Sequence, residues 1–313
     1  MKQPPLAGRC PTGCLRQAST SLLGSRINLG PPAPFPMVFS ETSSMSAPPD
    51  GIEGGHYARK QLYDGAWLIT WSHRRRFQLA LRLAAGFRGR RLLDYGCGDG
   101  TFLAMACNGP VAPAESVGAE ISDALVNDCR TRLGGRAGLS FVTVADLAGP
   151  GSEGRFDVLF CMEVLEHVVD RQPVFDLWDR LLPPGGEIVV SVPNETGPAL
   201  AIKQPARRLA RRCGMSDYPG SAPYTWREYA GALFAGPRQH ITRPVHSGAD
   251  GSTFHCHKGF NWRALRDELI QRWELVRIYR SPAPFLPVDF NSQIWFHLRK
   301  LRDGARCPTT SPS

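Results

Sequence analysis

A glycine-rich turn at residues 96–100, GCGDG, is the part of this 313-residue chain whose composition most plainly favours ligand binding. It directly follows the apolar run Leu92–Tyr95, which contains one acid, Asp94. Glycine allows the backbone to approach a ligand closely and to adopt positive φ angles. The carboxylate of Asp94 stands where it would stabilise a cationic group of that ligand. Because the spacing is not GxGxxG, a pyrophosphate laid on a helix N-terminus, as in dinucleotide binding, is disfavoured.

A second acid, Glu120, lies close to the end of the next apolar run, Ser116–Ile121. An acid about twenty residues after a glycine turn is placed to accept hydrogen bonds from both hydroxyls of a ribose. Taken alone, Glu120 is equally explained as a residue that stabilises the start of a helix. Together with the glycine turn, it favours a nucleoside as the ligand.

The segment 161–167, CMEVLEH, combines two acids with a histidine. If it is helical, Glu163, Glu166 and His167 stand at i, i+3 and i+4 and share one face. Two carboxylates and an imidazole suit a hard or borderline divalent cation. Without a cation, His167 is the candidate general base, because histidine titrates near neutral pH. The alternative is that the acids only stabilise a helix N-terminus.

The elements around these residues alternate between short apolar runs and helical patterns, which predicts an α/β fold. Runs without polar interruption are typical of parallel strands that are buried on both faces. The predicted strands are Leu92–Tyr95, Ser116–Ile121, Phe141–Val144, Asp157–Cys161, Ile188–Val192, Glu274–Tyr279 and Gln293–Leu298. The predicted helices are Thr101–Cys107, Asp123–Leu133, Pro173–Leu182 and Trp262–Arg272. We therefore expect a doubly wound, seven-stranded, mostly parallel Rossmann-like sheet with an antiparallel last strand.

In this order, the LLDYGCGDG turn, Glu120, the ADL step at 145–147 and FDVLFCME at 156–163 resemble the class I S-adenosylmethionine-dependent methyltransferases. The resemblance covers residues 70–195 well and 258–300 loosely. It implies that S-adenosylmethionine is the cofactor. The residues it assigns to cofactor binding are Asp94, Gly96, Cys97 and Gly98 for the methionine part, Glu120 for the ribose, Asp146 and Leu147 for adenine, and Met162 for the pocket wall.

Within that family the chain is most similar to the ubiquinone-biosynthesis O-methyltransferases and to relatives that methylate saccharides or small metabolites. The resemblance places Arg76 on the cofactor carboxylate; a solvated basic helix face is the alternative. Segment 163–167 also resembles the metal-binding ExxEH of small-RNA 2′-O-methyltransferases, which implies a Mg²⁺ or other divalent cation held by Glu163, Glu166 and His167. In those enzymes a distant histidine completes the site. His257 matches it, and because an extra glycine shifts the register, His255 is the alternative.

Residues 195–257 interrupt the alternation and are predicted to form a lid over the acceptor. Within them, Ile202, Ala206, Leu209 and Cys213 recur at helical spacing among basic residues. A basic amphipathic helix of this kind contacts an anionic membrane, or it is simply a solvated lid.

These observations lead to one interpretation with two rivals. We expect O-methylation of a small hydroxylated acceptor: a phenol, a quinone precursor, or a sugar of a glycolipid or polysaccharide. The net charge of +9 and the ExxEH pattern favour RNA 2′-O-methylation as an alternative, although the chain shows no recognisable RNA-binding module. A non-catalytic nucleoside-binding protein is the other rival.

The amino-acid composition also predicts the state of the two ends of the chain and the cellular compartment of the protein. Residues 1–50 are rich in Pro, Ser and Gly and, like residues 303–313, are expected to be disordered, which leaves residues 51–302 for the methyltransferase domain. Nine cysteines without a repeated CxxC favour a reducing compartment. With no apolar run of the roughly 18 residues that a spanning helix needs, we expect a cytoplasmic protein, at most peripheral to a membrane.

Overall fold

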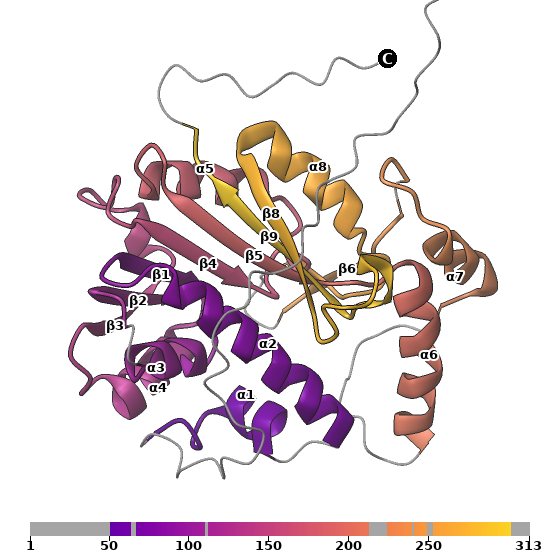
Figure 1. The fold of residues 1–313 in the computed structure, drawn as a ribbon, viewed down its shortest axis with the longest axis horizontal. Coiled ribbons are helices and arrows are strands. Elements are labelled where there is room, and N and C mark those ends of the chain that lie inside the picture. Colours follow the sequence, from indigo (N-terminus) through magenta and orange to yellow (C-terminus); the bar gives the residue numbers. More distant parts are fainter. Residues whose placement is uncertain are drawn as a thin grey trace, which may run out of the picture. The chain divides into compact units, whose positions relative to one another are not determined.

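Strands and helices alternate along the chain and build a seven-stranded sheet with helices on both faces (Figure 1). The computed structural model describes residues 51–63, 67–109, 112–212, 224–239, 241–248 and 253–301. The disorder predicted for residues 1–50 and 303–313 lies outside these ranges.

The sheet has the strand order β3-β2-β1-β4-β5-β9-β8. Its strands are β1 Arg91–Tyr95, β2 Glu115–Glu120, β3 Leu139–Thr143, β4 Val158–Met162, β5 Glu187–Pro193, β8 Glu274–Ser281 and β9 Gln293–Arg299. The first five are parallel, and β9 runs antiparallel to both of its neighbours. The predicted fold class, including the antiparallel last strand, is confirmed.

The helices follow the predicted alternation closely. They are α1 His56–Ala58, α2 Trp67–Ala85, α3 Thr101–Cys107, α4 Asp123–Leu133, α5 Gln172–Leu181, α6 Gly197–Arg212, α7 Trp226–Leu233 and α8 Trp262–Arg272. Helices α3, α4 and α8 have the predicted bounds, and side chains cap the start of α4 and of α8. The Ser122 hydroxyl accepts a hydrogen bond from the Leu125 N–H at the start of α4, and Asn261 caps α8 in the same way.

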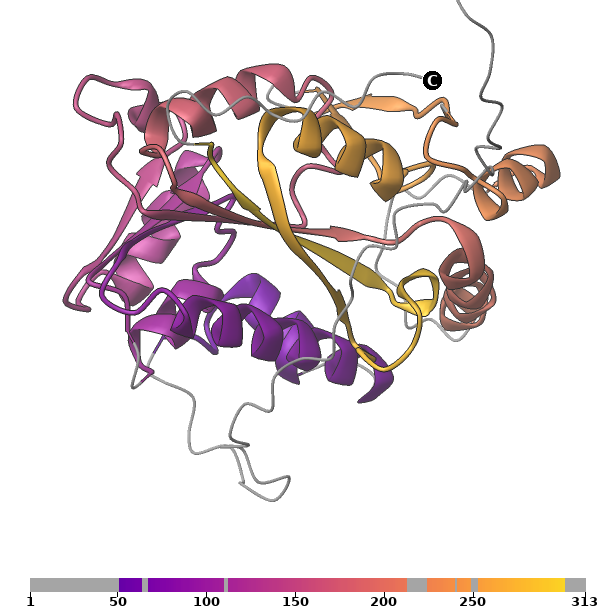
Figure 2. The ribbon, with the colours of Figure 1, turned by 45° about the horizontal axis from the view of Figure 1, so that its top comes forward.

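The central strands are mainly apolar because both faces of the sheet are covered. All seven residues of β5 are buried. On one face α2, α3 and α4 pack through residues such as Leu79, Phe102 and Cys129, and on the other α5 and α8 pack through Trp178 and Leu269. Figure 2 shows the two layers of helices on either side of the sheet. The layers hold β1, β2 and β4 in parallel, so that their carboxyl ends share one edge.

The segment predicted to be a lid contains α6, α7 and a two-stranded hairpin, β6 Val245–Ser247 and β7 Thr253–His255. The sequence predicted a helix in the region of α6 but neither α7 nor the hairpin. Three short turns of helix complete the description: η1 Arg59–Tyr63, η2 Asp146–Ala148 and η3 Val288–Phe290.

Two features bear on the expected compartment. All five cysteines in the described ranges are free thiols. Among the described helices, none combines the length and the apolar character that crossing a membrane requires.

Candidate active site

The glycine turn joins β1 to α3 at the carboxyl edge of the sheet. Gly96 has a φ of 77° and Gly98 a φ of 56°, both in the left-handed region. A Cβ atom on Gly96 would stand 2.4 Å from Cγ2 of Val164, which belongs to the loop after β4. Glycine is therefore required at residue 96 both for its φ angle and for the close approach of that loop.

Glu120, the last residue of β2, faces the same turn. Its Oε2 accepts a hydrogen bond of 3.0 Å from the Gly98 N–H, and its Oε1 accepts one of 2.7 Å from the Ile121 N–H. The carboxylate is thereby held beside the turn, where the family resemblance places the ribose.

Asp94 provides the test of whether the site fits a cationic cofactor. Its side chain is 1% exposed, and neither carboxylate oxygen has a hydrogen-bond partner among the described residues. Burial, together with the nearby carboxylates of Glu120 and Asp99, raises the pKa of Asp94 to about 8. A buried polar group without a partner is costly. A bound cation would stabilise the ionised carboxylate, so the residues present fit a sulfonium cofactor that carries an amino group.

The other predicted cofactor residues lie after β3, at the end of β4 and within the turn itself. Met162 ends β4 and is half-buried against the α2–α3 side of the core. The Leu147 side chain is buried in the opposite core, while exposed Asp146 accepts a hydrogen bond of 2.9 Å from the Thr143 N–H. That bond lowers the pKa of Asp146. The Cys97 thiol is buried beside Cys129, whose hydrogen bond, with burial, raises the pKa of Cys97.

Arg76 of α2 reaches the same edge from the helix that covers the sheet. Its guanidinium donates to Gln61 Oε1 and lies 3.8 Å from Glu163 Oε2. Its side chain is 11% exposed, which excludes the alternative of a solvated basic helix face. Arg76 therefore lies next to Glu163, which directly follows Met162 in the chain.

The helix on which the shared face of Glu163, Glu166 and His167 depended is not present at residues 163–167. The segment is a bend followed by a turn, and Glu163 has a φ of 59°. The Glu163 N–H still donates to Ser191 O of β5 at 2.9 Å, so the chain continues along the sheet before it turns. Glu163 consequently faces Arg76 and Ser191 instead of sharing a helix face with Glu166 and His167.

Glu166, His167 and His257 lie close together because the turn at residues 165–167 is hydrogen-bonded to the end of β7, just before His257. One ligand atom from each lies within 4.8 Å of the others. Nε2 of His167 is 3.2 Å from Nε2 of His257, and each is 3.8 Å from Glu166 Oε1. We call these three residues the triad. The structure thus brings His257 to the cluster, whereas His255 turns its Nδ1 to Pro244 O.

The protonation of the triad follows from its contacts. His167 Nδ1 lies 2.8 Å from the His255 carbonyl, which only accepts hydrogen bonds. Nδ1 therefore carries the proton, and the lone pair of a neutral His167 is on Nε2, toward His257. Burial lowers the pKa of His257 to about 4, so that ring is neutral near pH 7.

Glu166 is the acidic member of the triad. It is fully buried, and neither carboxylate oxygen has a hydrogen-bond partner among the described residues. Burial and the nearby Glu163 raise its pKa well above the ordinary value. An orphaned carboxylate beside two imidazole nitrogens is a donor set that suits a divalent cation.

A half-buried arginine that the sequence did not single out, Arg243, connects the two segments that carry the triad. Arg243 donates to the carbonyl oxygens of Glu166 and Cys256, the latter at 2.7 Å. Two hydrogen bonds between His167 and His255 join the same segments. The His167 Nδ1–H donates to His255 O at 2.8 Å, and the His255 N–H donates to His167 O at 2.9 Å. The sequence around Arg243 does not predict this role, because its partners Glu166 and Cys256 are 77 and 13 residues away along the chain.

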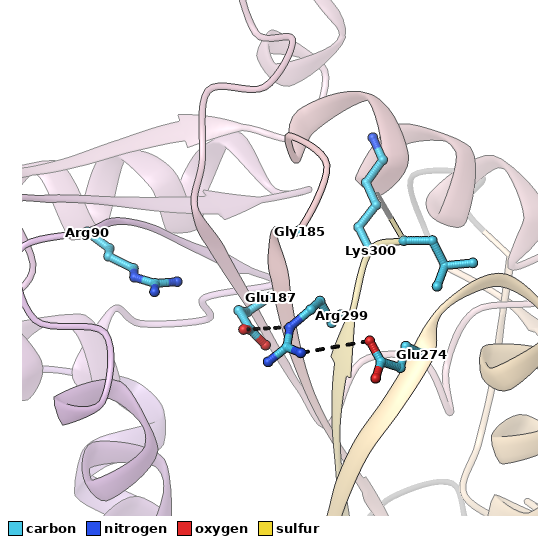
Figure 3. Close-up of a pocket in the computed structure, with 7 residues that line it drawn as sticks. Arg90, Gly185, Glu187, Glu274, Arg299 and Lys300 are labelled. Carbon is cyan, nitrogen blue, oxygen red and sulfur yellow. Dashed lines mark hydrogen bonds and ion pairs between the residues drawn. The ribbon is translucent and has the colours of Figure 1, made fainter. Parts of the chain in front are cut away.

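A surface hollow of about 540 Å³ lies at the opposite edge of the sheet, where β1, β5 and β8 begin (Figure 3). Its Arg299 is paired with Glu187 and Glu274, as the dashed lines show. The Arg90 guanidinium packs over the Phe87 ring at 5.6 Å. Because these charges already have partners, we assign no ligand to this hollow.

Comparison with known proteins identifies the family. A family model described as a methyltransferase domain matches residues 70–242, which is more than half of the chain. The chain belongs to this family. The resemblance to class I methyltransferases drawn from the motifs is confirmed.

The individual relatives match shorter regions. The chain is 34% identical over 123 residues to the ubiquinone biosynthesis O-methyltransferase of Alkalilimnicola ehrlichii, covering 38% of this chain and 48% of the relative. It is 36% identical over 111 residues to the ubiquinone biosynthesis O-methyltransferase of Psychrobacter arcticus, covering 35% of this chain and 43% of that relative. The chain thus spans about half the length of these curated relatives. The N-methyltransferase NodS of Bradyrhizobium japonicum, solved with S-adenosyl-L-homocysteine, has 15% identity and a TM-score of 0.45 over 80% of this chain and 99% of its own.

Proposed function

We propose that this methyltransferase transfers a methyl group from S-adenosylmethionine to an oxygen atom of a small hydroxylated acceptor. The observation that carries the proposal is the orphaned, buried carboxylate of Asp94 between the glycine turn and Glu120. A ligand that combines a ribose with a cationic amino acid part satisfies both acids at once. The cofactor supplies an activated methyl group on a sulfonium.

The residues of this chain position the reactants. Glu120 accepts hydrogen bonds from the ribose hydroxyls, Asp94 stabilises the cationic part, and the backbone of Gly96 and Gly98 lets the ligand approach. Arg76 is held by Gln61 and Glu163 within reach of the cofactor carboxylate. Much of the rate in such an in-line displacement comes from holding the two reactants in line.

We further propose that the triad of Glu166, His167 and His257 binds a divalent cation. Support comes from the orphaned Glu166 carboxylate and from the His167 tautomer, whose Nδ1–H donates to a backbone carbonyl as metal-bound histidines do. Imidazole ligands favour a transition-metal cation such as Co²⁺ or Zn²⁺ over Mg²⁺. The cation would orient two acceptor hydroxyls and ease deprotonation of the attacking one. Without it, Nε2 of His167 is the general base.

The acceptor class follows from the relatives and the triad together. Relatives with about one-third identity are named ubiquinone biosynthesis O-methyltransferases, which favours a phenol or quinone precursor. A saccharide or glycolipid with neighbouring hydroxyls also suits a cation-centred site.

RNA 2′-O-methylation is the second candidate. It is favoured by the position of His257, the distant histidine that completes the triad, as the resemblance to the small-RNA enzymes predicted. A non-catalytic nucleoside-binding protein would keep the cofactor contacts but transfer no methyl group.

The proposed membrane contact of helix α6 finds limited support. Two of its basic residues point inward, because Lys203 and Arg207 both pair with the buried Glu195 at 3.0 and 2.8 Å. Ile202 is 60% exposed and remains available for an apolar surface.

The test is methyl transfer from labelled S-adenosylmethionine to a panel of catechols, other phenols, sugars and short RNAs. We expect label on a small vicinal diol or catechol, with loss of activity in excess chelator and recovery on adding Mn²⁺ or Co²⁺. Label on RNA alone, decreasing with salt, would favour the second candidate. Cofactor binding without transfer to any acceptor would contradict the enzymatic proposal.

A further inference from the structure

Residues 51–63, which precede α2, carry no motif that the sequence analysis used. In the structure this segment is attached to the glycine turn. Its apolar residues Ile52, Ala58 and Leu62 are almost completely buried, at 0%, 1% and 2% exposure. The Ala58 N–H donates a hydrogen bond of 2.8 Å to Oδ2 of Asp99, the acid within the turn.

Asp99 is committed to this attachment. It is 3% exposed, and its Oδ1 accepts hydrogen bonds from the N–H and the hydroxyl of Thr101, at 3.2 and 2.7 Å. A Cβ on Gly55 would stand 2.5 Å from Asp99 Oδ2, so the segment approaches as closely as a glycine backbone allows. Asp99 thus joins the start of α3 to residues 55–58.

Arg132 of α4 ties the segment down a second time. Its guanidinium donates to the Gly51 carbonyl and to the Asp99 carbonyl, each at 2.9 Å. At the other end, Gln61 accepts a hydrogen bond from Arg76, and the Leu62 carbonyl accepts one from Arg74 at 3.1 Å. The segment therefore spans from the glycine turn to the arginine proposed to bind the cofactor carboxylate.

These tethers place the ring of Tyr57 on Gly98. A Cβ on Gly98 would lie 3.3 Å from Cδ2 and 3.4 Å from Cε2 of Tyr57. The N–H of the same glycine donates to Glu120, the proposed ribose ligand. Tyr57 is nevertheless 43% exposed. An aromatic ring held against a ligand-binding turn, with much of its surface still in water, is placed to be covered by the ligand.

We propose that residues 51–63 form a cap over the cofactor site and that Tyr57 is a cofactor-binding residue whose ring contacts the adenosyl group. This inference rests on the proposed function. Residues 51–63 would cover the nucleoside, although they carry no recognisable motif. Glu120 and Asp94 would provide the charged groups that bind the cofactor.

The test compares variants of the full chain in calorimetric titrations with S-adenosylhomocysteine. Tyr57→Ala should weaken binding roughly tenfold, as expected for the loss of an aromatic contact with a nucleoside. Tyr57→Phe should stay within about twofold of wild type, because the ring is retained. Phe285→Ala, which removes an 83% exposed aromatic from the β8–β9 connection, is the matched control and should leave binding unchanged.

A second measurement needs no variant. Nitration of the wild-type protein by tetranitromethane, read by mass spectrometry at Tyr57, should fall when S-adenosylhomocysteine is bound. Equal affinity of Tyr57→Ala and wild type, or unchanged nitration of Tyr57 in the saturated protein, would overturn the cap and leave the proposed function standing. Failure of the wild type to bind at all would instead remove the proposed function itself.

Discussion

Asp94 shows how one buried residue sets the conditions for ligand binding. Its pKa of about 8 means that the carboxylate is mostly protonated at pH 7 while its oxygens have no partner. A ligand with an ammonium group, which S-adenosylmethionine and S-adenosylhomocysteine both carry, binds the ionised form better. Binding is therefore coupled to the release of a proton from this residue.

The first prediction is a pH dependence of cofactor affinity. Because the folded pKa is raised, Asp94 must lose its proton on binding at any pH below about 8. The dissociation constant of S-adenosylhomocysteine should fall by up to about tenfold per pH unit between pH 6 and 8 and level off above. Calorimetry across this range checks it. Asp94→Asn should bind weakly with little pH dependence, and a steep dependence surviving in that variant would assign it to another group.

The second prediction separates the acids of the ExxEH motif. Glu166→Gln should lower the affinity for Co²⁺ more than about a hundredfold, since loss of even a supporting residue costs 10–100-fold. Glu163→Gln is the matched control and should bind Co²⁺ like wild type, because Glu163 pairs with Arg76 and Ser191. Visible absorption during Co²⁺ titration of the metal-free protein measures both. An equal loss of Co²⁺ affinity in the two variants would mean that Glu163 is also a metal ligand.

At the scale of elements, α6 is held to the sheet by a buried ion pair whose charges also act on His257 of the triad. Glu195 follows β5 and is 0% exposed, and Arg207 contacts it with two hydrogen bonds of 2.8 Å. Lys203 adds a third bond of 3.0 Å. Burial alone raises the pKa of Glu195, but the charges of Lys203 and Arg207 outweigh it and lower the pKa to about 2.

The third prediction follows from that shift. A folded-state pKa below the unfolded one stabilises the protein at pH values above the unfolded pKa, and the contribution is lost as pH falls from about 4.5 to about 2. Glu195→Gln should cost about 3 kcal/mol at pH 7. Its stability should also change less than that of wild type between pH 4.5 and 2. Urea unfolding at both ends of this range measures the difference; identical acid sensitivity of the two proteins would contradict the assignment.

The elements also show where local spacing succeeds and where it fails. Helices α3, α4 and α8 were predictable to the residue because of their apolar periodicity, with the glycine turn before α3 and capping side chains at the start of α4 and α8. Segment 163–167 was not, since its i, i+3, i+4 spacing suits a helix while pairing with β5 carries Glu163 into a bend. Spacing alone cannot report a contact with a strand nearly thirty residues away.

At the scale of the whole molecule, the sequence sufficed to predict the sheet and to place Asp94, Glu120 and Met162 at or near the carboxyl ends of its strands. Side chains at strand ends converge because parallel strands deliver them to one edge. The triad was predictable only in part, because His167 and His257 meet across 90 residues through a hairpin with weak strand patterns. The attachment of residues 51–63 to Asp99 was not predictable, since it uses backbone groups that carry no sequence signal.

The proposed activity requires that the glycine turn and Glu120 bind an adenosyl cofactor. A calorimetric titration of the purified protein with S-adenosylhomocysteine at pH 8 tests it most directly. We expect saturable one-site binding that Glu120→Ala weakens roughly a hundredfold, because the ribose loses a charged acceptor of two hydrogen bonds. Glu115→Ala, at the other end of the same strand and paired with Arg155, should bind like wild type. No binding by the wild-type protein at millimolar ligand, or equal affinity after Glu120→Ala, would contradict the claim.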